Sequence, residues 1–363
     1  MNNQADQGRR KLLMGLSGIL ASSLVKAQSF EFKPNQRYPD PAVFILDPSF
    51  TKYRLHNGTL EQVSTGMRWV EGPTYFPERG YLLFSDIPNN RIMKFSQQSG
   101  KTSIFRENAN FANGNARDQQ GRLISCEQSV SRRVTRTEKD GKISIPADRY
   151  QGRRLNAPND VIVKSDESIW FSDPIFGISG EWEGYKAMPE QPTTNVYKIS
   201  KDGKLIAMIT DLVNPNGLAF SPDEKKLYVV ESSSLPNNIL WVYDVAADGS
   251  LSNKSKFIDG SDNASLDGIK VDIDGNLWVA YGSSGAIEAM LMMVGNKNVY
   301  GLKGNPEDLD GVMVFNPAGK KIGFIKLPER CANLTFGGPK NNRLYMASSH
   351  SIYTLYVGDH GSV

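Results

Sequence analysis

The sequence contains few residues of the kinds that build thiol or imidazole sites. Among 363 residues there are two cysteines, Cys126 and Cys331, and three histidines, His56, His350 and His360. Zinc sites usually use histidine or cysteine ligands, so this composition argues against one. An exported protein could join the two cysteines. They fall in different repeats, however, and we expect two buried free thiols, because small apolar strand positions suit cysteine.

Neither charge nor hydropathy indicates a nucleic-acid partner or a membrane span. The formal net charge is only +3, from 42 basic and 39 acidic residues, and the sequence has no dense basic patch. The apolar run at residues 12–21 is too short, and too rich in glycine and serine, for a spanning helix. We therefore expect no nucleic-acid partner and no stable membrane span. The oligomeric state does not follow from the sequence.

Residues 1–27 have the layout of a bacterial export signal peptide. Arg9, Arg10 and Lys11 precede the apolar run, and a small-residue cleavage site follows at residues 25–27. The paired arginines are compatible with the twin-arginine route. A disordered tail with a chance apolar stretch is the alternative. We expect a periplasmic or secreted protein with an extended lead segment at 28–58 and a catalytic domain at 59–358.

A repeat dominates the rest of the chain. Six segments open on an oxygen-bearing residue, which we call the lead residue, followed by an apolar run, a turn and a second apolar strand. The lead residues are Glu71, Asn113, Asn159, Asn216, Asp267 and Asn333. Their spacings of 42, 46, 57, 51 and 66 residues, in a chain of strands and turns, indicate a propeller with one blade per repeat. We predict an all-β fold, a six-bladed β-propeller closed by an N-terminal strand at residues 60–63 that pairs with the last blade.

The lead residues predict a metal site. The first strand of each propeller blade lines the central channel, so one structural position brings all six side chains to one axis. Amide and carboxylate oxygens are hard ligands, which suit Ca²⁺, Mg²⁺ or Mn²⁺. Glu71, Asn159, Asn216 and Asp267 would supply two negative charges to one divalent cation. Any single lead residue is better explained as a turn residue than as a ligand, but six in register favour the metal site.

Two stretches exceed the repeat, at residues 177–195 and 282–309. Loops at the mouth of a channel often carry specificity, and packing over a blade edge is the alternative. In the second stretch, residues 287–293 are compatible with one or two helical turns. His350, near the end of a strand in the last blade, is as compatible with a strand cap as with a channel residue.

Several of these motifs resemble the SMP-30/gluconolactonase/luciferin-regenerating-enzyme-like family, and within it the bacterial gluconolactonases. The matching stretches are Glu71-Gly72-Pro73, Gly121 to Glu127, Arg154 to Val161, Ile169 to Pro174, Pro215 to Asp223, Leu266 to Ile269 and Ala332 to Gly338. The resemblance extends from about residue 60 to 357. It implies a six-bladed propeller with one catalytic divalent cation in the channel.

The resemblance also implies roles for individual residues. Glu71, Asn159, Asn216 and Asp267 match the family's metal ligands, Asp267 matches its presumed acid/base, and Asn113 matches a substrate contact. Two positions depart from the family. Phe111 stands where many members carry an arginine that contacts substrate, and Gln128 stands where relatives often have histidine. These departures leave the metal site intact and bear on which lactone is bound.

The function expected from these residues is metal-dependent hydrolysis of a sugar lactone, of the glucono-1,5-lactone type, to the aldonic acid. One divalent cation is expected as cofactor, Ca²⁺ first, with Mg²⁺, Mn²⁺ or Zn²⁺ as alternatives. In this mechanism Asp267 takes a proton from the attacking water and returns it to the leaving alkoxide. Two alternatives stay open: hydrolysis of other lactones or phosphoesters on the same scaffold, and a non-catalytic ligand-binding propeller with a structural cation.

Overall fold

The structure is a computed structural model that describes residues 32–234, 237–259, 264–283 and 306–362. Residues Pro34–Val363 form one compact unit, separate from Met1–Lys33. The predicted signal peptide at 1–27 and the helical turns expected at 287–293 lie outside the described residues. The predicted boundaries of the lead segment and the catalytic domain stay predictions.

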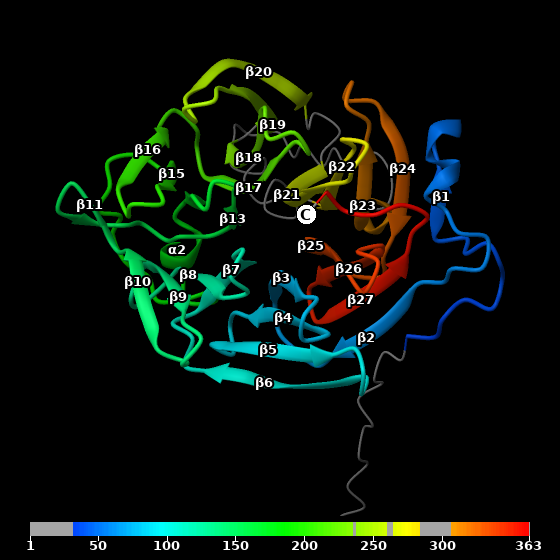
Figure 1. The fold of residues 1–363 in the computed structure, drawn as a ribbon. Coiled ribbons are helices and arrows are strands. Elements are labelled where there is room, and N and C mark those ends of the chain that lie inside the picture. The colour runs from blue at the N-terminus through cyan, green and yellow to red at the C-terminus, as the bar shows by residue number, and fades with distance from the viewer. Residues whose placement is uncertain (1–31, 235–236, 260–263, 284–305, 363) are drawn as a thin grey trace, which may run out of the picture. The chain divides into compact units, whose positions relative to one another are not determined.

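Pro34–Val363 contains six antiparallel sheets arranged around a common axis (Figure 1). Within five of them the chain runs outward from the axis, so that each strand pairs with the one before it, and the sixth differs only at its outer edge. The prediction of a six-bladed β-propeller is confirmed. Runs of β-branched and aromatic residues form the strands, and tight turns that contain Asp, Asn and Gly join them.

The innermost strands line the axis. They are β3 (Val70–Phe76), β7 (Ala112–Arg117), β13 (Val161–Val163), β17 (Pro215–Phe220), β21 (Ala264–Val271) and β25 (Cys331–Gly337). The second strands are β4 (Tyr81–Asp86), β8 (Leu123–Glu127), β14 (Ile169–Asp173), β18 (Lys226–Ser234), β22 (Leu277–Ser283) and β26 (Arg343–Ser348).

The outer strands complete the blades. The third strands are β5 (Arg91–Ser96), β9 (Arg133–Thr137), β15 (Asn195–Ile199), β19 (Asn237–Val245), β23 (Gly311–Phe315) and β27 (Ser351–Tyr356). The fourth strands are β6 (Lys101–Glu107), β10 (Ile143–Ala147), β16 (Leu205–Ile209), β20 (Leu251–Asp259), β24 (Lys321–Lys326) and, in the last blade, β2 (Glu61–Thr65). The remaining elements are β1 (Val43–Ile45), a hairpin of β11 (Arg149–Tyr150) and β12 (Arg153–Arg154), helix α2 (Phe176–Ser179) and two 3-10 helices, η1 (Pro48–Lys52) and η2 (Pro306–Leu309).

The ring closes through its N-terminal strand. β2 pairs antiparallel with β27, in a register that sets Glu61 opposite Thr354 and Thr65 opposite Ser351. This confirms the predicted closure, which removes an open edge from the last blade. The segment at 28–58, expected to be extended, also contributes structure: β1 adds a fifth strand to blade five, and η1 follows it.

The hydrophobic core lies between neighbouring blades. One cluster joins blades two and three through Phe171 and Tyr197, and another joins blades three and four through Trp170 and Leu218. Each fully buried side chain of this size stabilises the fold by about 1.5–3 kcal/mol. Both cysteines are buried and free, as expected.

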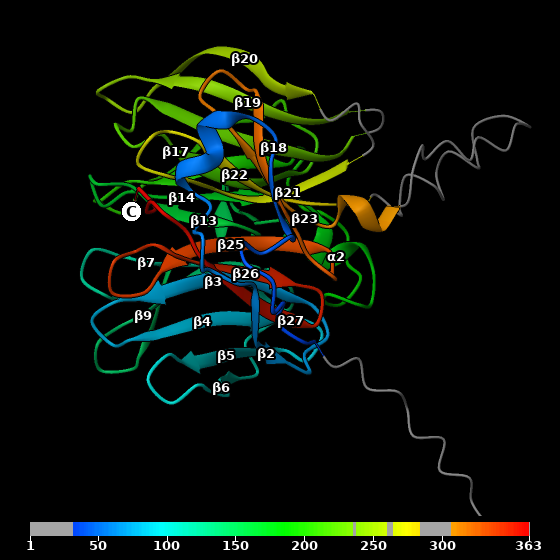
Figure 2. The same ribbon diagram turned by 90° about the vertical axis from the view of Figure 1, so that its right-hand side faces the viewer.

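The two faces of the ring carry different elements. Helix α2 lies on one face, and the C-terminal residues lie on the other (Figure 2). No helix among the described residues has the length and apolar character needed to cross a membrane.

Candidate metal and substrate site

A pocket of about 280 Å³ lies where the innermost strands begin. Its walls combine the starts of these strands with residues from the β14–β15 loop and from the loop before β25. The lining residues are Trp69, Glu71, Asn113, Asn159, Phe176, Trp182, Glu183, Asn216, Ser232, Ser265, Leu266, Asp267 and Arg330. All five residues predicted for the site, from five different blades, therefore line one pocket.

The sixth lead residue is placed differently. Asn333 does not line the pocket: its Nδ2 donates to Glu71 Oε2 at 3.1 Å, and its Oδ1 accepts from the backbone N–H of Leu334 at 2.8 Å. Asn333 therefore holds a candidate ligand in place and does not offer an oxygen itself. His350 lies in the turn between β26 and β27 with its side chain 65% exposed, and it does not line the pocket.

A shift in strand register beside the lead residues sets the direction of their side chains. The pairing of the inner strand with the second strand shifts beside the lead residue in blades one, two, four, five and six. The shifts fall between Glu71 and Thr74, Ala112 and Asn115, Pro215 and Leu218, Leu266 and Ile269, and Cys331 and Asn333. Such irregularities turn a side chain out of the regular alternation of the sheet.

The glycine that follows four of the lead residues has a steric cause. At each of these positions the next blade's lead residue lies so close that a side chain would not fit. A Cβ would lie 2.1 Å from Asn113 O at Gly72, 2.4 Å from Asn159 O at Gly114, 2.4 Å from Asp267 O at Gly217 and 2.2 Å from Asn333 at Gly268. Real Cβ contacts are essentially never that short, so the repeated motif records close packing of neighbouring blades around the axis.

The pocket concentrates negative charge. Glu71 and Asp267 are only 4% and 9% exposed. Burial raises the pKa of Asp267 to about 7, against the favourable charge of Arg330. Burial, and then the charge of Asp267, raise the pKa of Glu71 well above its usual range. A third carboxylate, the buried Asp160, acts on both in the same direction. Buried carboxylates that raise one another's pKa in this way call for a counter-charge.

The oxygen atoms that face the pocket are suitable ligands for a hard divalent cation. Asn113 Nδ2 donates to Gln128 Oε1 at 3.1 Å, and Asn216 Nδ2 donates to Ser232 Oγ at 3.2 Å. Both amide nitrogens are thus engaged, which leaves the carbonyl oxygens available. Glu71 Oε2 accepts from Gly72 N and from Asn333, and Oε1 accepts no hydrogen bond within the described part of the chain.

The ligand set also argues against a softer metal. The lining of the pocket contains no histidine or cysteine. Within the described ranges no group of three or more His, Cys, Asp or Glu side chains is arranged to hold a metal, so amide oxygens would have to complete the site. A cation at this site would be held by two carboxylates and by amide oxygens, a set that suits Ca²⁺. Glu71, Glu183, Asp267 and Arg330 give the lining a net formal charge of −2, which one divalent cation would balance.

Sequence reasoning missed two charged residues of the pocket. Glu183 comes from the β14–β15 loop, within the 177–195 stretch whose role was left open. Arg330 comes from the loop that leads into β25. The length of the 177–195 stretch was a usable indication of a wall-forming loop. The sequence gives no such indication for Arg330, because this residue precedes the last repeat and belongs to no motif.

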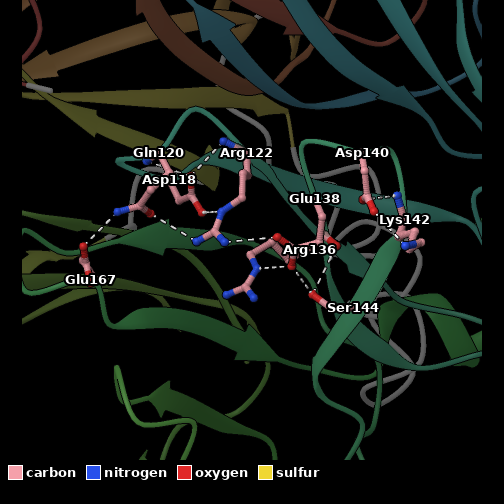
Figure 3. Close-up of polar contacts among 9 residues, drawn as sticks. All are labelled: Asp118, Gln120, Arg122, Arg136, Glu138, Asp140, Lys142, Ser144 and Glu167. Atoms are coloured by element: carbon pink, nitrogen blue, oxygen red, sulfur yellow. Dashed lines mark hydrogen bonds and ion pairs between the residues drawn. The ribbon is translucent and has the colours of Figure 1, made fainter.

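A larger crevice of about 510 Å³ lies at the opposite ends of the strands, between blades two and three. It is lined by residues of the β7–β8, β13–β14 and β15–β16 turns and by strands β9 and β10. Arg122 contacts Asp118 at 2.7 Å and Glu138 at 3.1 Å, and Arg136 contacts Glu138 at 2.6 Å (Figure 3). These charges neutralise one another, and none of the predicted site residues lies here.

Comparison with known proteins agrees with the fold. Residues 69–297 and 307–350 match the SMP-30/Gluconolactonase/LRE-like region. A gluconolactonase from Zymomonas mobilis is 26% identical over 315 residues, covering 81% of this chain and 80% of that protein.

Two solved structures are also similar. A gluconolactonase from Xanthomonas campestris is 31% identical with a TM-score of 0.73, covering 87% of this chain and 94% of that one. A calcium-binding protein, regucalcin, from Agrobacterium tumefaciens is 18% identical with a TM-score of 0.61, covering 83% and 94%, and shares the fold. The extent of the family match, taken with the fold, shows that this chain belongs to the SMP-30/gluconolactonase/LRE-like family.

Proposed function

We propose that the protein is a metal-dependent lactonase that opens a sugar lactone of the glucono-1,5-lactone type to its aldonic acid. The observation that carries the proposal is the convergence of Glu71 and Asp267 with Asn113, Asn159 and Asn216 on one pocket. The gluconolactonases among the relatives support the lactone as substrate. The pocket is large enough for one six-membered sugar ring.

The residues proposed to hold the cation are Glu71, Asn159, Asn216 and Asp267, and Ca²⁺ is the proposed ion. Hard oxygen donors support this choice, and one structural neighbour is described as calcium-binding. When bound, the cation would supply Lewis-acid polarisation of the lactone carbonyl. Asn333 and Ser232 keep Glu71 and Asn216 oriented through the hydrogen bonds described above.

Asp267 is the proposed acid/base. Lactone hydrolysis requires a group that accepts a proton from the attacking water and returns it to the alkoxide of the opened ring. Asp267 is buried and lines the pocket beside the other proposed ligands, which places its carboxylate to take a proton from a water there, a role that requires a long or shared contact with the cation. Asn113, held by Gln128, is proposed to contact the substrate beside it.

The test is hydrolysis of glucono-1,5-lactone by the purified chain, followed by proton release above the spontaneous rate. The assay is run after EDTA treatment and again with Ca²⁺, Mg²⁺, Mn²⁺ or Zn²⁺ added back. We expect turnover that EDTA abolishes and Ca²⁺ restores. Turnover that EDTA leaves unchanged would contradict metal dependence. A protein that binds Ca²⁺ but hydrolyses no lactone would contradict the lactonase proposal.

We also propose that the protein is exported, on the strength of the signal-like residues 1–27. Fractionation of bacterial cells that express the full chain, with N-terminal sequencing of the product, tests this. A product that keeps residues 1–27 and stays in the cytoplasm would contradict it.

A further inference from the structure

The pocket contains two charged side chains that neither the proposed metal set nor the proposed proton transfer uses. They are Glu183 and Arg330, and they have opposite charge. Arg330 is close enough to lower the pKa of Glu183, although burial raises it overall. The two are nevertheless not in ion-pair contact: neither has a salt bridge within 4.0 Å to any part of the chain that the structure describes. An acceptor and a donor thus line one pocket without satisfying each other.

The backbone around Glu183 is held firmly against blade two. Gln128 Nε2 donates to the backbone carbonyl of Glu183 at 2.9 Å, and the backbone N–H of Tyr185 donates to Ser129 Oγ at 2.9 Å. At Gly184 a Cβ would lie 2.2 Å from the carbonyl oxygen of Gly177, so the loop fits tightly. Gln128 therefore links Glu183 to Asn113, and the position of the loop is set by the wall of the pocket.

Arg330 is held from the other side. Its Nη2 donates to Ser265 Oγ at 2.8 Å, and its guanidinium carbon lies 5.9 Å from the centre of the Trp69 ring. Gly282 makes room for its stem, since a Cβ there would lie 2.5 Å from Arg330 Cγ. Of its five N–H donors, only one has a hydrogen-bond acceptor within the described residues. The guanidinium is thus fixed in place, and Nη1 stays available.

The chemistry of this pair selects one class of group. A carboxylate only accepts hydrogen bonds, and a guanidinium only donates them. A hydroxyl group does both, so neighbouring hydroxyls on one ring would satisfy both residues together. An anionic substituent would be repelled by Glu183, and an apolar ring would leave the remaining hydrogen-bonding capacity of both residues unused.

We propose that Glu183 and Arg330 recognise the hydroxyl groups of the substrate ring and so give the enzyme its preference for polyhydroxylated lactones. This inference rests on the proposed lactonase function. It also assigns a role to the 177–195 stretch, which delivers Glu183 to the pocket. A buried polar site discriminates strongly against a substrate that lacks the matching groups.

The test compares two six-membered lactones, glucono-1,5-lactone and δ-valerolactone, which differ in their hydroxyl substituents. The readout is the ratio of their kcat/KM values in wild type, Glu183→Gln and Arg330→Met, with Ca²⁺ present. We expect the ratio to fall about tenfold in Glu183→Gln and up to about a hundredfold in Arg330→Met, as charged hydrogen bonds are lost. Ca²⁺ affinity, measured by calorimetry without substrate, should change far less than it does in Glu71→Gln, because neither residue is proposed to bind the cation directly.

Glu181→Gln is the matched control. Glu181 lies two residues from Glu183 in the same loop, is exposed and does not line the pocket. The control should keep the wild-type ratio. If both variants keep that ratio, or lose activity equally on both lactones, the inference is wrong. Ca²⁺ binding that is weakened in Glu183→Gln as much as in Glu71→Gln would instead place Glu183 among the ligands. A wild-type protein that hydrolyses neither lactone would refute the proposed function, which is a different result from any of these.

Discussion

The axial pocket and the crevice between blades two and three are both rich in charged side chains, but they use them differently. Beside the crevice Glu138 accepts hydrogen bonds from Ser144 and Arg136, two residues of the crevice lining, and these hydrogen bonds lower its pKa to about 2 (Figure 3). In the pocket burial raises the pKa of Asp267 to about 7. The crevice is the larger hollow, so volume does not identify the site. What separates the two is that charges are paired in one and left for a ligand in the other.

The largest effect should follow removal of the proposed acid/base. Asp267→Asn should lower kcat on glucono-1,5-lactone by roughly a hundred- to ten-thousandfold, because proton transfer contributes on that scale. Steady-state kinetics with saturating Ca²⁺ measures this, and thermal melting checks the fold. Glu138 pairs with Arg122 and Arg136 of the crevice lining, and Glu138→Gln is the carboxylate control that should keep full activity. Substantial activity in Asp267→Asn would show that another group moves the proton.

The next effect concerns packing around the axis. Gly217→Ala should destabilise the protein by at least about 2 kcal/mol, because its Cβ would overlap the backbone of Asp267. Gly203→Ala in the crevice is the comparison: no atom lies within 4 Å of its Cβ, and only its φ of +87° opposes the change, by about 1–2 kcal/mol. Urea unfolding measures both. Equal stability of Gly217→Ala and wild type would contradict the close approach of blades four and five.

Glu71→Gln should weaken cation binding without destabilising the fold. The substitution removes one of two ligand charges, so Ca²⁺ affinity should fall tenfold or more. In the absence of metal the variant should be as stable as wild type or more stable, because a buried like charge is gone. Calorimetric titration with Ca²⁺ and melting in EDTA measure the two quantities. An unchanged titration would exclude Glu71 as a ligand.

The pH dependence of stability should differ with and without the cation. The folded pKa of Asp267 is raised to about 7 from 3.8, so the native state holds a proton that the unfolded state has lost. Without metal, Asp267 should therefore make stability fall as pH rises from about 4 to 7, with no further loss from this group above 7. Added Ca²⁺ should weaken or reverse this trend and bind more tightly as pH rises. Melting curves from pH 4 to 8, with EDTA or Ca²⁺, test it, and parallel curves would contradict it.

The smallest effect is expected in the crevice. Arg122→Gln breaks partly exposed ion pairs with Asp118 and Glu138, and such pairs contribute about 0–1 kcal/mol each. Stability should fall slightly and lactone kinetics should not change. Loss of activity in this variant would break the contrast between the two regions.

Much of the fold could be predicted because short local sequence patterns identify each repeat. The oxygen-bearing lead residue recurs in all six blades, a glycine follows it in four, and Asp-Gly turns recur in blades two to five. A period of this length has few structural solutions. The strand at 60–63 could be predicted to close the ring because an open edge strand is unfavourable. The short strand at Val43–Ile45 could not, because its pairing with β24 has no repeat behind it.

The residues of the site also fall into those that the repeat predicts and those that it does not. Glu71, Asn113, Asn159, Asn216 and Asp267 share one strand position, so the propeller itself brings them together. Asn333 occupies the same position yet supports Glu71, because a side-chain amide can donate as well as accept and the sequence does not say which it will do. Glu183 and Arg330 reach the pocket from loops, whose paths depend on tertiary packing such as that of Gly184 against Ser129. Loop residues of this kind become visible only in three dimensions.

The glycine contacts between adjacent blades separate two demands that most active sites combine. At Gly72, Gly114 and Gly217 the glycine lies against the backbone of the next blade's lead residue, whereas the side chains of five lead residues line the pocket. Exchange of one of these five side chains should therefore act mainly within the pocket, while exchange of one of these glycines is transmitted to the next blade. In such a ring the residues that bind a ligand at the axis can be substituted one at a time, while the packing between the blades is kept.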